Sequence, residues 1–186
     1  MGDSESARAL AEEVKGRYGR LDVLVNNAGM TRYVAHDDLD GLDDDLIDQI
    51  FRVNWRGAFA CVRAFKGLLT DGDGGLVVNI SSIAGTTGEG SNVAYCASKA
   101  ALDSMTRSLA RALAPQIRVA SVAPGLVEGD YAQKLDPEWR QAQIERTPLH
   151  RLARAEDVAN AVLALATLLP FTTGNIIHVD GGRPLM

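Results

Sequence analysis

Four short apolar segments, separated by stretches with helical periodicity, limit this 186-residue chain to a small set of folds. The segments cover residues 22–26, 76–80, 117–123 and 175–179. They are apolar on both faces, which is typical of strands in a parallel sheet covered by helices. Helices are predicted at residues 5–18 (capped by Ser4), 44–69, 94–114, 137–146 and 155–169. This alternation predicts an α/β fold, a doubly wound parallel sheet with right-handed crossovers.

Length and charge restrict the organisation of the chain and its partners. At about 150 residues per domain, the length predicts a single domain over residues 1–186. A net charge of −5 without a basic stripe argues against a nucleic-acid partner. No apolar run reaches the roughly 18 residues of a membrane span, so no membrane partner is expected. Cys61 and Cys96 are too few for a disulfide framework and favour a reduced, cytoplasmic location.

The segments that follow the predicted strands are the first place to look for chemistry. Ligands of doubly wound sheets bind beyond the carboxyl ends of the strands. These segments are residues 26–29, 81–92, 124–130 and 180–182. Ser82 follows the second strand, where its hydroxyl could bind a substrate oxygen, although a serine there is more often a turn or cap residue.

An amide interrupts the apolar stripe of the predicted 44–69 helix. The stripe runs through Ile47, Phe51, Asn54, Ala58, Cys61 and Phe65. A buried amide without hydrogen-bond partners costs about 1–3 kcal/mol. From the helix alone, Asn54 is therefore interpreted first as a structural amide bonded to neighbouring backbone, with a functional role as the alternative.

The predicted 94–114 helix carries a phenol and an ammonium on one face. Tyr95 and Lys99 are four residues apart and extend the apolar stripe of this helix. A cation near a phenol favours the phenolate and lowers its pKa from about 10. Tyr95 is then a candidate general acid or base near neutral pH. The alternative, more common for such a pair alone, is a surface tyrosine packed along a lysine stem.

Taken together, these residues resemble the signature of the short-chain dehydrogenases/reductases. The matching segments are Asn26–Gly29, the V-N-x-x-G segment around Asn54, Ile80–Ser82, Tyr95–Lys99, Pro124–Gly125 and Thr173–Gly182. Their order and spacing agree with the family, with Ser82 thirteen residues before Tyr95. The resemblance covers nearly the whole chain from Ser4, and it is closest to the 3-oxoacyl carrier-protein reductases and related sugar or polyol dehydrogenases.

The resemblance implies hydride transfer between NAD or NADP and a carbonyl or alcohol carbon of a small-molecule substrate. Tyr95 would exchange a proton with the substrate oxygen, and Ser82 would hold that oxygen. Lys99 would lower the tyrosine pKa and bind the nicotinamide ribose, and Asn54 would hold a water molecule in a proton relay. The implied cofactor-binding residues are Asn26, Ala28, Gly29, Tyr95, Lys99, Pro124, Gly125 and Val127.

Two features depart from the family pattern. Gly129 stands where the family often has threonine, which removes one hydroxyl near the cofactor. No glycines have the T-G-x-x-x-G-x-G or G-x-G-x-x-G spacing of the turn that receives the pyrophosphate at a helix N-terminus. The likeness begins at the helix before the family's fourth strand, so an N-terminally shortened chain without the first three strands is expected, with weak or absent cofactor binding and negligible turnover.

This expectation has two consequences. The loss of three strands would leave residues 22–26 as a bare apolar edge, which invites pairing, so we expect a second protomer or a rearranged helix to cover it. The family also implies a homodimer or homotetramer formed through the 94–114 helix. The alternative to an enzyme is a catalytically inactive remnant that acts as a binding or assembly partner of full-length relatives.

No metal site is expected. Residues 36–48 include seven aspartates, but an EF-hand loop here would need acidic residues where His36 and Ile47 stand. His36, His150 and His178 lack metal-ligand spacing. The aspartates suit a solvated loop and an acidic helix N-terminus.

Overall fold

The computed structural model describes residues 2–72 and 74–185, apart from the side chain of Tyr131. The strands are β1 (Val23–Asn26), β2 (Gly75–Ile80), β3 (Ile117–Pro124) and β4 (Ile176–Val179). The helices are α1 (Ser4–Tyr18), α2 (Asp44–Phe51), α3 (Ala58–Thr70), α4 (Ala84–Thr87), α5 (Val93–Leu113), α6 (Asp130–Gln133), α7 (Pro137–Glu145) and α8 (Ala155–Thr167). A π-helical segment, η1 (Arg52–Gly57), joins α2 to α3, and a short 3-10 helix, η2 (Arg183–Leu185), follows β4.

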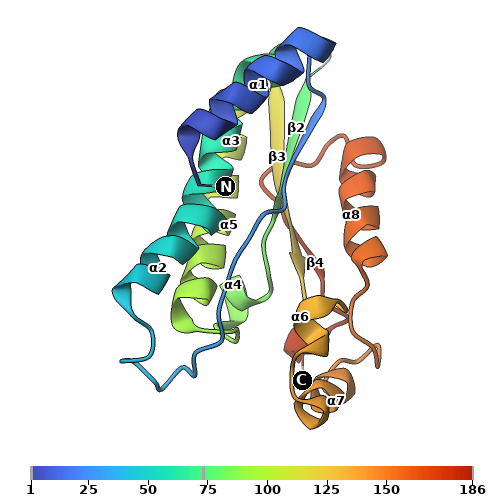
Figure 1. Ribbon diagram of the computed structural model, residues 1–186. Helices are drawn as coiled ribbons and strands as arrows, with labels where there is room; N and C mark the ends of the chain where they lie inside the picture. Colours follow the sequence, from blue (N-terminus) through green and yellow to red (C-terminus); the bar gives the residue numbers. More distant parts are fainter. Residues whose placement is uncertain (1, 73, 186) are drawn as a thin grey trace.

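The four strands form one parallel sheet in the order β1-β2-β3-β4. Helices α1, α3 and α5 lie on one face of this sheet, and α8 lies on the other (Figure 1). The carboxyl ends of the strands point toward α4 and α6, at the lower end of the sheet in that view. The predicted doubly wound α/β sheet is therefore confirmed, and each of its strands matches a predicted apolar segment to within two residues.

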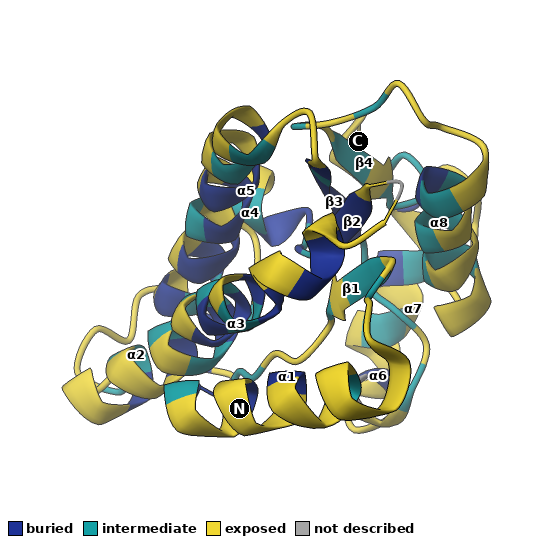
Figure 2. Ribbon diagram, turned by 90° about the horizontal axis from the view of Figure 1, so that it is seen from above, coloured by how far each residue is buried: buried dark blue, intermediate teal, exposed yellow. Residues whose placement is uncertain are grey.

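The two central strands are buried on both faces, which explains their continuous apolar sequence. Val77 and Val119 pack with the apolar side chains of α3 and α5. Their neighbours Leu76, Val78 and Val122 face the other way and pack against α8. Figure 2 shows the consequence: buried residues line the sheet and the inner sides of the helices, and exposed residues cover their outer sides. Burial on both faces is the reason that these strands show no alternation.

The first helix begins one residue earlier than predicted, and its cap is different. Ser4 is the first helical residue, not the cap. The cap is Asp3, whose carboxylate accepts hydrogen bonds from the backbone N–H groups of Glu5 and Ser6, at 3.1 and 3.0 Å. Aspartate caps helices as well as serine does, and its negative charge also interacts favourably with the helix dipole.

The predicted 44–69 helix is interrupted. The hydrogen bonds of the π-helical turn η1 join residues five apart instead of four, which breaks the regular α-helical spacing. The buried positions before this turn are Leu46 and Ile50. The predicted stripe residues Ile47 and Phe51 are only half-buried. Asn54 remains buried because it lies inside the π-helical turn itself. Such turns often occur at functional sites.

Strand β1 forms one edge of the sheet, opposite β4. Within the described residues it pairs only with β2, and Val25 is 42% exposed. Helix α1 packs on α3, and coverage of this edge by a rearranged helix stays a prediction. The structure contains one chain, and coverage by a second protomer stays a prediction. No helix in residues 2–72 and 74–185 is long and apolar enough to cross a membrane.

The close approach of α4 to α5 depends on Gly85. A Cβ atom added there would lie 2.9 Å from the backbone N of Ala100 and from the carbonyl carbon of Lys99. Gly85→Ala is therefore predicted to lower the free energy of unfolding by about 1–3 kcal/mol. Gly67→Ala is the matched control, since its Cβ would meet nothing within 4 Å on α3, and it should raise stability by about 0.5–1 kcal/mol. Urea denaturation checks both, and equal effects would contradict this packing.

Candidate active site

The ammonium group of Lys99 ties helix α5 to the carboxyl end of strand β2. Its Nζ donates a hydrogen bond to the carbonyl oxygen of Ile80 at 2.8 Å. The same Nζ lies 5.7 Å from the centre of the Tyr95 ring, one turn earlier on α5. Lys99 is only 5% exposed. The predicted pair of phenol and ammonium on one helix face is therefore present, and it faces the sheet instead of solvent.

The first turn of α5 fixes the backbone of Tyr95. Asn92 caps the helix, and its Oδ1 accepts a hydrogen bond from the Tyr95 N–H at 2.7 Å. The Asn92 Nδ2 donates to the carbonyl oxygen of Arg32 at 2.7 Å and to the hydroxyl of Thr31 at 3.2 Å. The cap thus joins α5 to the loop after β1. This role of Asn92 was not predicted, although an asparagine three residues before Tyr95 is a typical capping signal.

Asn54 is 1% exposed and fully engaged with its neighbours. Its Oδ1 accepts from the N–H of Met30 at 2.8 Å, and its Nδ2 donates to the carbonyl oxygen of Met30 at 3.1 Å. The Nδ2 also donates to the hydroxyl of Ser98 at 3.0 Å, and that hydroxyl donates to the carbonyl oxygen of Tyr95 at 2.8 Å. These hydrogen bonds explain how the Asn54 amide is tolerated inside the protein, and they give it a structural role in supporting the helical turn that carries Tyr95. A role in a water relay stays a prediction.

Ser82 lies just beyond β2, next to the end of β3. Its hydroxyl oxygen accepts a hydrogen bond from the N–H of Ala84 at 3.2 Å, which leaves its own hydrogen free to rotate. The following residue, Ile83, donates its N–H to the carbonyl oxygen of Pro124 at 3.0 Å. The segments of Ser82 and of Pro124–Gly125 are therefore joined at one end of the sheet, as the parallel register requires.

The predicted cofactor-binding residues after β1 divide into two groups. Asn26 points inward, where its Nδ2 donates to the Oδ1 of Asn79 at 2.8 Å. Ala28 and Gly29 are exposed. A Cβ atom at Gly29 would lie 3.5 Å from both the Asn54 Oδ1 and the Lys99 Nζ. The missing side chain at Gly29 therefore leaves room beside the lysine, which fits a ligand that must reach Lys99.

The predicted cofactor-binding residues after β3 lie at the same carboxyl end of the sheet. Gly125 donates its N–H to the carbonyl oxygen of Val179 at 3.1 Å. A Cβ atom there would lie 3.2 Å from the Cα of Asp180, so the two loops are in close contact. Val127 forms a parallel bridge with Ala153. Pro124, Gly125 and Val127 are thus held in place by backbone contacts to the last strand and to the loop before α8.

A chain of buried polar groups beneath the site was not predicted. Asn79 Nδ2 donates to the hydroxyl of Thr106 at 2.8 Å, and that hydroxyl bonds the hydroxyl of Ser121, also at 2.8 Å. Asp103 lies beside them with only 3% of its surface exposed. The available signal for Asp103 was its position four residues after Lys99, which places both side chains on one helix face.

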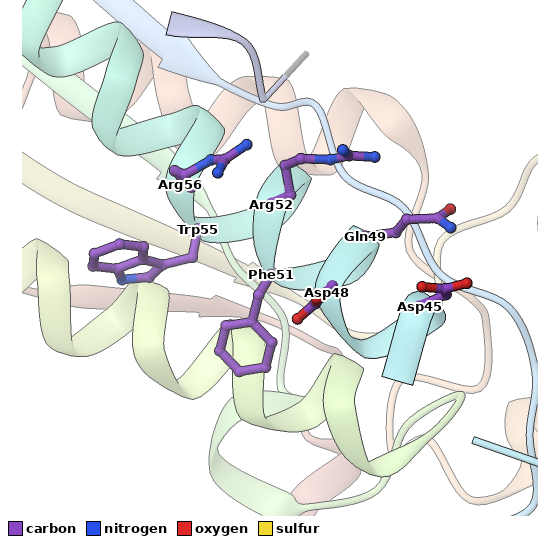
Figure 3. A pocket seen from close by; sticks show the side chains of 7 residues that line it. All are labelled: Asp45, Asp48, Gln49, Phe51, Arg52, Trp55 and Arg56. Carbon is purple, nitrogen blue, oxygen red and sulfur yellow. The ribbon is translucent and has the colours of Figure 1, made fainter. Parts of the chain in front are cut away.

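A surface hollow lies along α2 and η1, away from these residues. Its lining consists of Asp45, Asp48, Gln49, Phe51, Arg52, Trp55 and Arg56 (Figure 3). It contains none of the predicted site residues and none of the groups that converge on Lys99. Within the described part of the chain, no three histidine, cysteine or acidic side chains are placed to hold a metal ion.

Burial changes the protonation of Lys99. Removal from water lowers the pKa of its ammonium from 10.5 to about 8, and the negative charge of Asp103 opposes that effect. Lys99 is thus mostly protonated at pH 7, about half protonated at pH 8, and mostly neutral above pH 9. The site can therefore offer an ammonium beside the Tyr95 ring at neutral pH.

Comparison with known proteins identifies the family. A family model described as Enoyl-(Acyl carrier protein) reductase matches residues 1–183. The 3-oxoacyl-[acyl-carrier-protein] reductase FabG of Thermotoga maritima is 36% identical over 182 residues, or 97% of this chain and 73% of that protein. The chain belongs to the short-chain dehydrogenase/reductase family.

Other members of the family agree. FabG of Escherichia coli is 34% identical over 182 residues, or 97% of this chain and 73% of the relative. A structure from Burkholderia xenovorans assigned to the short-chain dehydrogenases/reductases matches with a TM-score of 0.91 and 36% identity, over 100% of this chain and 74% of the other. Gluconate 5-dehydrogenase of Burkholderia cenocepacia, in complex with NADP and tartrate, matches with a TM-score of 0.91 and 27% identity, over 100% and 73% of the two chains.

The buried ammonium of Lys99 predicts a pH-dependent stability. Its pKa is about 8 in the folded chain and about 10.5 in the unfolded chain, so between these values the unfolded chain binds more protons. The free energy of unfolding of the protein with Lys99, minus that of Lys99→Met, should therefore rise with pH across this window, by on the order of 3 kcal/mol.

Urea denaturation from pH 7.5 to 10.5 measures this difference. Both proteins carry Tyr95→Phe, which removes the neighbouring phenol from the titration. Lys66→Met, which removes an exposed lysine from α3, is the control for the loss of a lysine side chain. A Lys99→Met difference that varies with pH no more than the Lys66→Met difference would contradict a buried ammonium.

Proposed function

We propose that this chain transfers hydride between a nicotinamide cofactor, NAD or NADP, and the carbonyl or alcohol carbon of a small molecule. The observation that carries the proposal is the packing of Lys99 between the Tyr95 ring and the end of β2, next to the segment of Ser82. A surface tyrosine packed along a lysine stem would not need a buried ammonium. Membership of the short-chain dehydrogenase/reductase family supports the same conclusion.

The roles of the side chains follow from their chemistry. The cofactor, when bound, supplies the hydride to the substrate carbon. In the reducing direction, the Tyr95 hydroxyl gives its proton to the substrate oxygen as the carbonyl becomes an alcohol. The positive charge of Lys99 stabilises the phenolate that remains. The Ser82 hydroxyl donates a hydrogen bond to the substrate oxygen and holds it in position.

The residues of this chain fit the nicotinamide end of the cofactor better than its pyrophosphate. Lys99, Tyr95 and the residues Pro124, Gly125 and Val127 would hold the nicotinamide riboside, and the space beside Gly29 supports this assignment. Ala28 and Gly29 would lie along the rest of the cofactor, with Asn26 behind them. The printed sequence has no glycine-rich turn for the pyrophosphate, so we infer that binding by these 186 residues is weak.

The substrate class is proposed from the relatives. The FabG proteins of T. maritima and E. coli are named as reductases of 3-oxoacyl groups on acyl carrier protein. We therefore propose a 3-oxoacyl thioester as the first substrate to test. The reaction then consumes a ketone and produces a hydroxyl group on the same carbon.

Self-association is a further part of the proposal. Val93 at the start of α5 and Phe171 after α8 are large apolar side chains exposed on the single chain. A second copy that covered such residues would remove apolar surface from water. We propose a cytoplasmic homodimer or homotetramer, in which the β1 edge is also covered.

Tyr95→Phe is predicted to remove the activity. Since binding is weak, the wild-type chain should oxidise NADPH slowly, and only at millimolar concentration, with a 3-oxoacyl thioester. The substitution removes the proton donor and should lower the rate by at least about 100-fold, with the thermal unfolding temperature unchanged within about 2 °C. Absorbance at 340 nm measures the rate. Equal rates in both proteins would contradict the role of Tyr95, and no turnover in either would favour the inactive binding partner.

Cofactor binding gives a separate prediction. Isothermal titration of the 186-residue chain with NADPH should show a dissociation constant above about 100 μM, since the contacts are confined to the nicotinamide side. Lys99→Met should weaken binding further, and Lys66→Met should leave it unchanged. A micromolar constant for the wild-type chain would contradict this account of the site.

A further inference from the structure

Asp103 is a buried carboxyl group to which the proposed reaction gives no role. It lies on α5, one turn after Lys99 and two turns after Tyr95, on the side of the helix that faces the sheet. It is the one acidic residue in the sequence of α5. Within the described residues, neither of its carboxyl oxygens has a well-aligned hydrogen-bond partner. Buried carboxyl groups are normally paired or hydrogen-bonded, so this one calls for an explanation.

The surroundings of Asp103 favour its charged form only partly. Burial raises the pKa of the carboxyl group, and the nearby hydroxyls of Ser81 and Ser121 lower it. In the structure the Ser81 hydroxyl donates a long hydrogen bond of 3.4 Å to the carbonyl oxygen of Lys99. The Ser121 hydroxyl forms a hydrogen bond of 2.8 Å with the hydroxyl of Thr106. Both hydroxyls can rotate, so they can donate to Asp103 when it carries a negative charge.

The charged and titratable groups that face Asp103 come from two elements. Lys99 and Arg107 lie one turn away on either side of it on α5, and His178 lies on β4. Ser81, just after β2, and Ser121 on β3 contribute hydroxyl groups. Among these groups, Lys99 is itself buried, so its charge is the least screened by water. The carboxylate of Asp103 opposes the loss of that charge.

We propose that Asp103 is a positioning residue of this site, whose buried negative charge keeps the Lys99 side chain in its ammonium form. The inference rests on the proposed function of Lys99 as the group that stabilises the Tyr95 phenolate. Asp103 acts on the reaction through Lys99. A buried carboxylate without a fixed partner reduces stability, and this role accounts for its presence.

The test is a direct titration of Lys99. The chain has four lysines, so [13C]lysine labelling gives a simple spectrum, and Lys99→Met identifies the Lys99 signal. In the wild-type chain about half of Lys99 should be protonated at pH 8. In Asp103→Asn that fraction should fall at least about twofold. Asp103→Glu, which keeps the charge, should restore most of it, and Glu12→Gln, which removes an exposed acid on α1, should change nothing.

The titration separates this role from a structural one, because stability alone does not. Asp103→Asn removes both the desolvation cost of a buried carboxylate and its attraction to the Lys99 ammonium, and these act on the unfolding temperature in opposite directions. An unchanged Lys99 titration in Asp103→Asn would overturn the proposal, whatever the effect on stability. Asp103→Ser gives the same test with a smaller neutral side chain if the amide disturbs folding. No cofactor or substrate is needed, so the result is independent of whether the chain catalyses hydride transfer.

Discussion

The hydrogen bond from the Lys99 ammonium to the Ile80 carbonyl oxygen, at 2.8 Å, is the contact on which the rest of the site depends. It joins the first turns of α5 to the end of β2, and so brings the Tyr95 ring to the segment that carries Ser82. It also requires a positive charge to be buried, which lowers the pKa of Lys99 to about 8. The neighbouring asparagines, serines and Asp103 form the polar surroundings that such a buried charge needs.

The sheet and the proximity of Tyr95 to Lys99 could be predicted because short-range patterns determine them. The β2 and β3 sequences are apolar on both faces since helices cover both faces, and this pattern is visible without knowing which helices these are. Tyr95 and Lys99 are neighbours because four residues make about one helical turn. The likeness to the short-chain dehydrogenases/reductases then gave each residue a role that spacing alone leaves open.

The features that escaped prediction depend on contacts between distant parts of the chain. Asn79 lies in a predicted apolar strand, and its burial is tolerated because Asn26 and Thr106 form hydrogen bonds with its side chain. In the π-helical turn, the side chain of Asn54 forms hydrogen bonds with both the backbone N–H and the carbonyl oxygen of Met30, which lies in the loop after β1. Neither the partners nor the extra backbone of such a turn can be read from a periodic pattern.

We propose that the residues at the carboxyl end of the sheet support direct hydride transfer from a nicotinamide cofactor to a substrate carbon. The most direct measurement is the transfer of deuterium from NADPH labelled at the nicotinamide C4, on the transferred face, to a 3-oxoacyl thioester, with the product analysed by mass spectrometry. We expect a hydroxyacyl product that carries one deuterium on the new carbinol carbon, formed by the wild-type chain and not by Tyr95→Phe. A product without deuterium, or equal labelling by both proteins, would contradict it.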